Sequence, residues 1–279
     1  MDFLLIFKTV IISIIKGATN YLPIAASEQG YIVYRLLAYP SGDKATMIYA
    51  LIGLGSSMAV LVLLSHRIKE SFNFMGQGQK KGMRLWTNIF LGAIPYIILY
   101  FVFMKIGKIN LLGSKVIAFG AIASGILLFI GNGKYRRNRI RKKAIASFWK
   151  INGLQAFKIG LYQCLSFIPG LSRVGAVIVG GWFSNLATGA SVDLALFITV
   201  PGVILVSIRD LFYVASAITF GASEIVSMIL AVAVSFLTAL VTLDSFLSFA
   251  KKASLKLFAF FNILLGSATL VFMLLGKIN

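Results

Sequence analysis

Apolar segments of about 20 residues recur along the whole chain, and a helix of that length crosses the roughly 30 Å hydrocarbon core of a bilayer. Hydrophobic residues make up 59% of the 279 residues and the mean hydropathy is +0.92, whereas soluble domains are ~45–50% apolar. The sequence therefore predicts an all-α polytopic membrane protein with a single integral membrane domain over residues 1–279. A retained first helix is expected near the N-terminus, and spanning segments are predicted at 47–65, 86–104, 111–131, 194–220, 224–249 and 257–275.

The net charge of +19 is concentrated in the gaps between these apolar segments. Basic residues gather at 67–84, 134–143 and 251–256, where they orient a membrane protein with these gaps in the cytoplasm and attract anionic lipids. This distribution argues against nucleic-acid binding. The single cysteine, Cys164, excludes an internal disulfide, and with only one histidine a transition-metal site held by the protein is not expected.

One apolar stretch, 157–183 (FKIGLYQCLSFIPGLSRVGAVIVGGWF), is broken in its middle by Pro169-Gly170. Ser172 and Arg173 follow the break. An arginine at membrane depth costs at least ~2.5–3.5 kcal/mol, so an opposite charge is expected beside it. An anionic ligand would supply that charge. The alternatives are that Arg173 extends to the membrane surface or pairs with a carboxylate such as Asp193.

The charge pattern also predicts how the broken stretch sits. All three basic gaps lie on one side of the membrane only if 157–183 enters the membrane and returns to the same side. By the same reasoning the Pro-broken stretch 16–31 approaches from the opposite side. The two stretches are weakly similar, which predicts an inverted-repeat helical bundle, with approximate repeats 1–131 and 150–279 and two re-entrant helix–break–helix hairpins. The structural breaks are expected at Pro23, Pro169 and Gly170.

Both broken stretches resemble the signature regions of the bacterial undecaprenyl-diphosphate phosphatase family, which is associated with bacitracin resistance. The family's second motif reads like PG-x-SRSG-A-T, and residues 169–177 read PGLSRVGAV. The runs 53–60 (GLGSSMAV) and 197–202 (FITVPG) are also similar to family patterns. The resemblance covers nearly the whole chain. It implies the interlocked inverted-repeat fold and a place in the bacterial cytoplasmic (inner) membrane.

The first motif departs from the family, where it reads like EG-x-TE-x-LP-x-SSTGH. The two acidic positions are Lys16 and Asn20 here, the serine pair is Ala25-Ala26, and the histidine position falls at Gln29, or at Tyr31 with a small gap. In the second motif the second serine and the threonine are replaced by Val174 and Val177. Hydrolysis of a diphosphate needs a nucleophile, a proton-transferring group and charge stabilisation, so these replacements remove proton-handling groups.

The remaining polar residues give a candidate site. Arg173 is expected to bind phosphate as a two-point fork. The other phosphate-binding candidates are Lys16, Asn20 and Gln29. The catalytic candidates are Ser172, Ser27 and Glu28, although a structural pairing of Glu28 with Lys16 or Arg173 is the alternative. No cofactor is required by the sequence, and a Mg or Ca ion is expected only if the chain is an active enzyme.

Three functions remain open. The favoured one is a family member that binds a polyprenyl phosphate or diphosphate at a midplane cavity, with lost or reduced hydrolysis, either with or without movement of the lipid across the membrane. The alternative is an active undecaprenyl-diphosphate phosphatase with a rearranged site. The third is an unrelated small-solute transporter. The expected partners are polyprenyl phosphate lipids and anionic membrane lipids. The sequence leaves the oligomeric state open.

Overall fold

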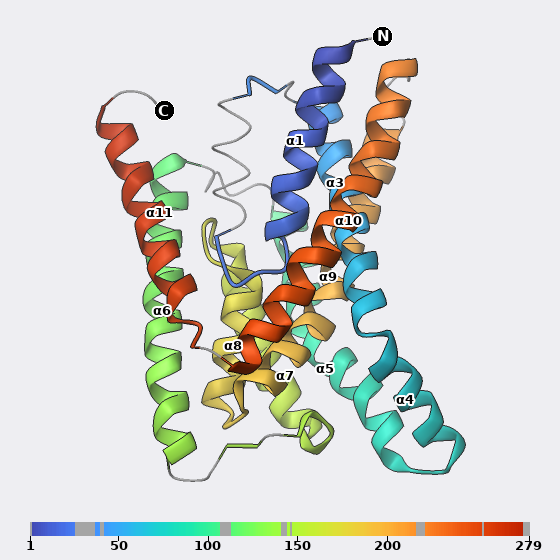
Figure 1. Cartoon of the computed structure of the whole chain (residues 1–279), viewed down its shortest axis with the longest axis vertical. Coiled ribbons are helices and arrows are strands. Elements are labelled where there is room, and N and C mark those ends of the chain that lie inside the picture. The colour runs from blue at the N-terminus through green and yellow to red at the C-terminus, as the bar shows by residue number, and fades with distance from the viewer. Residues whose placement is uncertain are drawn as a thin grey trace. The chain divides into compact units, whose positions relative to one another are not determined.

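A computed structural model describes residues 2–25, 37–39, 42–106, 113–140, 144–145, 147–215, 221–252 and 254–275. These residues are almost entirely helical (Figure 1), with one isolated parallel bridge between Ile145 and Leu186. The helices are α1 (Phe3–Thr19), α3 (Asp43–Leu63), α4 (Ser65–Gly76), α5 (Lys80–Ile106), α6 (Ser114–Ile140), η1 (Phe148–Lys150), α7 (Gly153–Gln163), η2 (Cys164–Phe167), α8 (Arg173–Phe183), α9 (Thr188–Ala215), α10 (Ala222–Lys252) and α11 (Lys256–Leu274).

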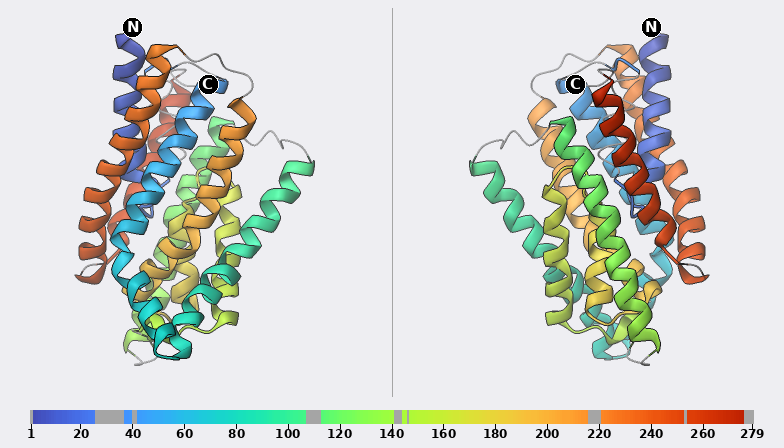
Figure 2. Two further views of the ribbon diagram at one scale, coloured as in Figure 1. Left: turned by 90° about the vertical axis from the view of Figure 1, so that its right-hand side faces the viewer. Right: turned by 90° about the vertical axis from the view of Figure 1, so that its left-hand side faces the viewer.

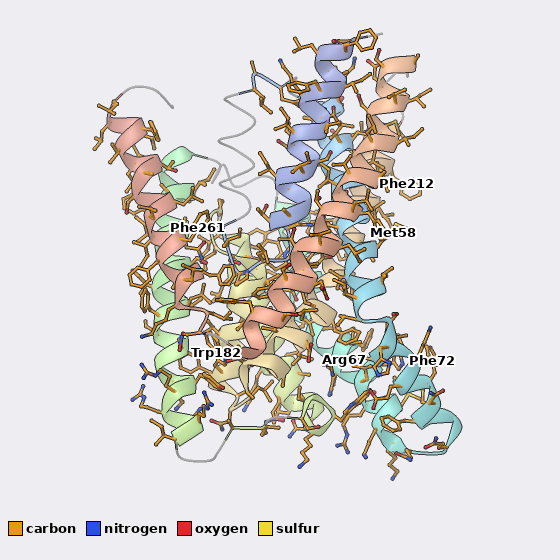
Figure 3. The ribbon with its side chains drawn as sticks, viewed as in Figure 1. Met58, Arg67, Phe72, Trp182, Phe212 and Phe261 are labelled. Carbon is orange, nitrogen blue, oxygen red and sulfur yellow. The ribbon has the colours of Figure 1, made fainter. Side chains whose placement is uncertain are left out.

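Within the described residues, six helices are long and apolar enough to cross a membrane, judged by length and composition. They are α3, α5, α6, α9, α10 and α11, which correspond to the six predicted spanning segments. The prediction of an all-α, multi-pass membrane protein is therefore confirmed. Large apolar side chains on these helices face outward, as expected for lipid-facing surface, and Met58, Phe212 and Phe261 are examples in Figure 3.

Several predicted boundaries were wrong. The basic gap at 67–84 contains α4 and the first turn of α5, and the basic run that begins at Lys134 continues α6 as far as Ile140. Lysine and arginine are good helix formers, so these runs extend the helices beyond the apolar segments. The span predicted at 194–220 is shifted toward the N-terminus, and α9 passes through Pro201 without a break. Proline is tolerated within a membrane helix when neighbouring groups satisfy the freed backbone atoms.

The chain divides into two compact units, which are described separately. The first comprises the described residues of Met1–Leu22, Gln29–Leu64 and Val200–Ser245. In this unit α1 packs on α3, and glycines bring the helices close together. A Cβ at Gly17 would lie 2.7 Å from the Ser235 Cα atom, and one at Gly53 would overlap the Ser207 hydroxyl. Gly17 and Gly53 therefore allow their helices to approach closely.

The second unit comprises the described residues of Pro23–Glu28, Ser65–Thr199 and Phe246–Asn279. In this unit α6 runs beside α11 (Figure 2), and α7 packs on α5 and α8. Glycines again allow the backbones to approach. A Cβ at Gly125 on α6 would lie 2.6 Å from the Ala259 carbonyl oxygen, and one at Gly266 on α11 would lie 2.6 Å from the Ala118 carbonyl oxygen. Gly125 and Gly266 thus lie on the packing faces of α6 and α11.

The broken stretch 157–183 forms the expected helix–break–helix element within the second unit. α7 and η2 end at Phe167, residues 168–172 are non-helical, and α8 starts at Arg173. The two arms run antiparallel, because Gln155 at the start of α7 donates a hydrogen bond (3.4 Å) to the carbonyl oxygen of Ser184 just after α8. In the other stretch, α1 ends at Thr19 and the chain is non-helical through Pro23. Its second arm lies outside the described residues, and re-entry into the membrane stays a prediction for both.

Candidate functional site

The break before α8 is shaped by the close passage of α6. Gly170 has a φ of +88°, a conformation that favours glycine, and a Cβ there would overlap the Ile117 carbonyl oxygen. From the other side, a Cβ at Gly120 would overlap the carbonyl oxygen of Pro169. The Pro169-Gly170 turn is therefore held against the backbone of α6 by two positions that only glycine fits, and this contact fixes where α8 begins.

Ser172 is the N-cap of α8. Its Oγ accepts a hydrogen bond from the Gly175 N–H (3.1 Å), and its own N–H donates to the Ser124 Oγ on α6 (3.2 Å). The side chain is buried. A serine in this position satisfies one of the backbone donors at a helix start, so the residue has a clear structural role. Its catalytic role stays a prediction.

Arg173 is the first residue of α8 and is only partly exposed. Its Nη2 donates to the Tyr96 hydroxyl on α5 (3.1 Å), and its guanidinium carbon lies 5.0 Å from the centre of the Tyr96 ring. Phe167 stacks on the same ring, with the centroids 4.8 Å apart. The Arg173 Nε is buried and has no hydrogen-bond partner. Among the described residues no carboxylate forms an ion pair with this arginine.

The alternative in which Asp193 neutralises Arg173 was wrong. The Asp193 carboxylate on α9 instead pairs with Arg67 on α4, with 2.5 Å between Oδ2 and Nη2. Asp193 is almost fully buried. Among its described neighbours Arg173 therefore contacts a hydroxyl group and an aromatic ring, and no carboxylate neutralises its charge.

Sequence reasoning missed Asn262 on α11, which joins the two motifs. Its Nδ2 donates to the Pro23 carbonyl oxygen (3.1 Å) and to the Ser124 Oγ (3.4 Å), and its Oδ1 accepts from the Ala25 N–H (2.9 Å). Ser124 in turn accepts from the N–H of Ser172. Asn262 is completely buried. Its position as an amide within an apolar span is the sequence signal that could have identified it, because such groups are costly in lipid.

Lys16 and Asn20 belong to the first unit and lie one helical turn apart at the end of α1. The Lys16 Nζ lies 5.0 Å from the centre of the Tyr49 ring. The Asn20 Nδ2 donates to the Ser56 Oγ on α3 (2.7 Å), and beside it the hydroxyls of Tyr21 and Ser57 are 2.7 Å apart. The amide of Asn20 is thus engaged by α3.

The predicted site residues fall into three groups. Ser172 and Arg173 lie in the second unit, together with the breaks at Pro23, Pro169 and Gly170. The close contacts of Gly120 and Gly170 and the hydrogen bonds of Asn262 hold this group together. Lys16 and Asn20 lie together in the first unit. Ser27, Glu28 and Gln29 lie outside the described residues. The cavity shared by all candidates therefore stays a prediction.

Metal ligands do not cluster in the part of the chain that the structure describes. No group of three or more His, Cys, Asp and Glu side chains there could hold a metal ion. What the described site offers is a partly buried guanidinium group at a helix start, with hydroxyl and aromatic neighbours. That arrangement is suited to binding an oxyanion.

Comparison with known proteins covers nearly the whole chain. The model of the family described as bacitracin resistance protein BacA matches residues 9–268. A protein of Clostridium perfringens (strain SM101 / Type A) named undecaprenyl-diphosphatase is 32% identical over 290 aligned positions, which cover 95% of each chain. Proteins of Clostridium tetani (undecaprenyl-diphosphatase; 28% identity, 96% of each chain) and Clostridioides difficile (undecaprenyl-diphosphatase 2; 31% identity, 95% of this chain and 94% of the other) are similar over nearly their full lengths. This chain therefore belongs to the bacitracin resistance protein BacA family, whose similar members are named undecaprenyl-diphosphatases.

Proposed function

We propose that this chain binds the phosphate head group of a polyprenyl phosphate or diphosphate at the start of α8, with Arg173 as the main ligand. The observation that carries the proposal is the surroundings of Arg173. Among the described residues, its buried Nε has no hydrogen-bond partner and no carboxylate pairs with its guanidinium group. A buried donor left unsatisfied costs about 1–3 kcal/mol, and more in a charged group. A bound oxyanion would supply both the missing acceptor and the missing charge.

The position of Arg173 supports an anion rather than another kind of ligand. The first N–H groups of a helix lack partners within the helix, and the helix dipole adds partial positive charge at the same end. No acidic residue occurs in the first turn of α8. Arginine presents two parallel N–H donors to a phosphate, which gives the contact a defined orientation.

The lipid character of the ligand is inferred from two further observations. The chain is a multi-pass membrane protein with outward-facing apolar side chains. The similar proteins of Clostridium perfringens and Clostridium tetani are named undecaprenyl-diphosphatase, after undecaprenyl diphosphate, a polyprenyl lipid. We therefore infer a polyprenyl carrier lipid, bound in the bacterial cytoplasmic membrane. Movement of the bound lipid across that membrane is the further step that an inverted-repeat bundle would allow.

We also infer that hydrolysis is lost or weaker than in relatives that carry acidic residues at the positions of Lys16 and Asn20. The ammonium group of a lysine cannot replace a carboxylate as the ligand of a divalent cation. The side-chain amide of Asn20 already donates a hydrogen bond to the Ser56 Oγ. The Oγ of Ser172 accepts the capping hydrogen bond from Gly175. These features favour binding over cleavage. A Mg or Ca ion would be needed only for cleavage.

The second candidate is an active undecaprenyl-diphosphatase with a rearranged site. It is favoured by the similarity over about 95% of each chain to proteins that carry this name. In that case Glu28, together with Ser27 or Ser172, is the candidate set for the chemistry. Burial of a carboxyl group raises its pKa, and a carboxyl group with a raised pKa can transfer protons.

One experiment separates the two. The purified chain is incubated with undecaprenyl diphosphate and Mg²⁺ or Ca²⁺, and released phosphate is measured beside the variant Lys16→Glu, Asn20→Glu, Ala26→Ser, Gln29→His. The proposal expects much faster release from the quadruple variant than from the natural chain. Equal rates would establish the second candidate. Binding of undecaprenyl phosphate, measured in parallel, tests Arg173 independently of hydrolysis, with Arg137→Ala as a matched control because Arg137 is exposed and is not part of the site.

A further inference from the structure

A cavity of about 470 Å³ lies within the second unit, at the end of α8 that is remote from Arg173. Trp182, labelled in Figure 3, forms part of its wall. Nine residues of helix separate Arg173 from Trp182, which corresponds to roughly 14 Å along the axis. The cavity is therefore distinct from the candidate site at the start of α8. Five helices contribute to it: the ends of α6, α8 and α10 and the starts of α9 and α11.

The charges around this cavity are all of one sign. Arg136 and Arg139 lie three residues apart on one face of α6, and Lys256 begins α11. No carboxylate occurs among the described residues that line the cavity. The two arginines also border an adjoining hollow of about 390 Å³. Three cations around one cavity attract an anion, and two arginines on neighbouring turns can bind the oxygens of a single phosphate.

Polar groups in the cavity wall are held in fixed positions. The Trp182 Nε1 donates to the Thr188 Oγ1 (3.2 Å), and the Tyr135 ring stacks on Trp182 with the centroids 6.0 Å apart. Asn132 donates to the Ser254 Oγ (2.7 Å). The site is thus a built pocket with aromatic and hydroxyl walls.

Two helix starts add to the positive potential that the side chains create. Thr188 and Gly189 begin α9, Lys256 begins α11, and neither helix has an acidic residue in its first turn. The N-cap of α11 is Leu255, which has no side chain capable of capping. The first-turn N–H groups therefore reinforce the three cations.

We propose that this cavity is a second anion site, which binds a phosphate ester. The volume exceeds that of a bare phosphate and falls in the range of about 300–1,000 Å³ that is common for small-molecule sites. The charge pattern predicts that the C-terminal end of α6 faces the cytoplasm, where anionic lipid head groups gather and basic pockets between helices bind them. A soluble phosphate ester offers the same chemistry, so the experiment must distinguish these two sources.

The test uses Trp182 as the reporter. Replacing the other two tryptophans (Trp86→Phe, Trp149→Phe) leaves Trp182 alone to fluoresce. One arm titrates glycerol 3-phosphate into the detergent-solubilised protein, with sodium chloride at matched ionic strength as the blank. The other arm compares nanodiscs of pure phosphatidylcholine with nanodiscs that contain increasing phosphatidylglycerol. A saturable change in the first arm identifies a soluble ester as a sufficient ligand, and one confined to the second identifies a lipid head group.

The variants decide whether the signal comes from this cavity. Arg136→Gln with Arg139→Gln should weaken the apparent affinity at least ~10-fold, which corresponds to about 1.4 kcal/mol. The matched control, Lys134→Gln with Arg137→Gln, removes the same charge from the same turns of α6 without altering the cavity lining and should leave the affinity unchanged. Arg173→Ala should also leave it unchanged, which separates this site from the proposed head-group site. No saturable change in either arm, or an equal loss in the control pair, would overturn the proposal.

Discussion

The carboxylate of Asp193 on α9 is paired with Arg67 on α4, and not with Arg173, which follows the Pro169-Gly170 break. This relationship gives Arg67 and Arg173 different roles. Arg67 has a nearly buried carboxylate as its partner, whereas Arg173 has only the hydroxyl and ring of Tyr96 among described residues. The first is therefore a structural ion pair, and the second is a cation whose partner we expect to be the ligand.

Asp193→Asn should destabilise the protein by up to about 3–5 kcal/mol, because it removes the charge that pairs with Arg67 in an ion pair whose carboxylate is almost fully buried. The measurement is the unfolding midpoint of the purified protein in detergent. The double variant Arg67→Gln, Asp193→Asn should recover part of this loss, since it removes the uncompensated charge. The single variant Arg67→Gln completes the comparison. If the losses in stability of the two single variants add up to the loss of the double variant, the two side chains are not energetically coupled as the structure indicates.

Arg173→Ala should weaken binding of undecaprenyl phosphate by about 10- to 100-fold, because hydrogen bonds to charged groups contribute about 1.5–3 kcal/mol each. Arg173→Lys should restore only part of the affinity, since an ammonium group lacks the two-point fork. Equilibrium binding in nanodiscs measures both variants. Unchanged affinity in Arg173→Ala with normal thermal stability would rule out Arg173 as the head-group ligand.

Asn262→Ala should release the first motif from α11. The substitution removes the acceptor for the Ala25 N–H and the donor for the Pro23 carbonyl, and each buried group left unsatisfied costs about 1–3 kcal/mol. A cysteine placed at the buried position of Ala25, with Cys164→Ser in the background, should react with a thiol reagent much faster in the Asn262→Ala variant. Asn132→Ala, which removes a hydrogen bond elsewhere in the second unit, should leave the reaction rate unchanged.

Gly120→Ala should destabilise the protein by about 1–3 kcal/mol, because the added methyl group would overlap the Pro169 carbonyl oxygen and force the break away from α6. Gly133→Ala on the same helix is the matched control. Nothing lies within 4 Å of a Cβ at Gly133, so that substitution should be neutral or stabilise the helix by up to about 1 kcal/mol. Thermal unfolding distinguishes the two, and equal effects would show that the contact at Gly120 is not restrictive.

The predicted orientation places the end of α6 in the cytoplasm and residues 41–44 outside. In a Cys164→Ser background, a membrane-impermeant thiol reagent added to intact cells should modify a cysteine at Asp43 but not one at Arg137. Both positions are exposed, whereas the neighbouring Asn138 is buried and would react poorly from either side. The reverse labelling pattern would overturn the orientation and, with it, the placement of the proposed second anion site on the cytoplasmic side.

The sequence alone determined the class of the protein, its family and its main spans. These follow from long apolar runs and from motif residues that are close together in the chain, so they do not depend on how the helices pack. The break at Pro169-Gly170 was predictable for the same reason, since proline and glycine impose it locally. Helix ends were less predictable. Basic residues continue α6 to Ile140 and α9 passes through Pro201, because local propensity is outweighed by context.

Tertiary structure alone decided which polar groups meet. The partner of Asp193 is Arg67, which lies 126 positions earlier in the sequence. The hydrogen-bond partners of Asn262 are Pro23, Ala25 and Ser124. Pairings of this kind depend on which helix faces turn toward each other. The apolar pattern constrains that choice only weakly when a helix is apolar on all sides, because membrane helices lack the polar face that marks the exterior of a soluble protein. Interhelical contacts through glycine and buried polar side chains select one arrangement among many, and they become visible only once the helices are packed.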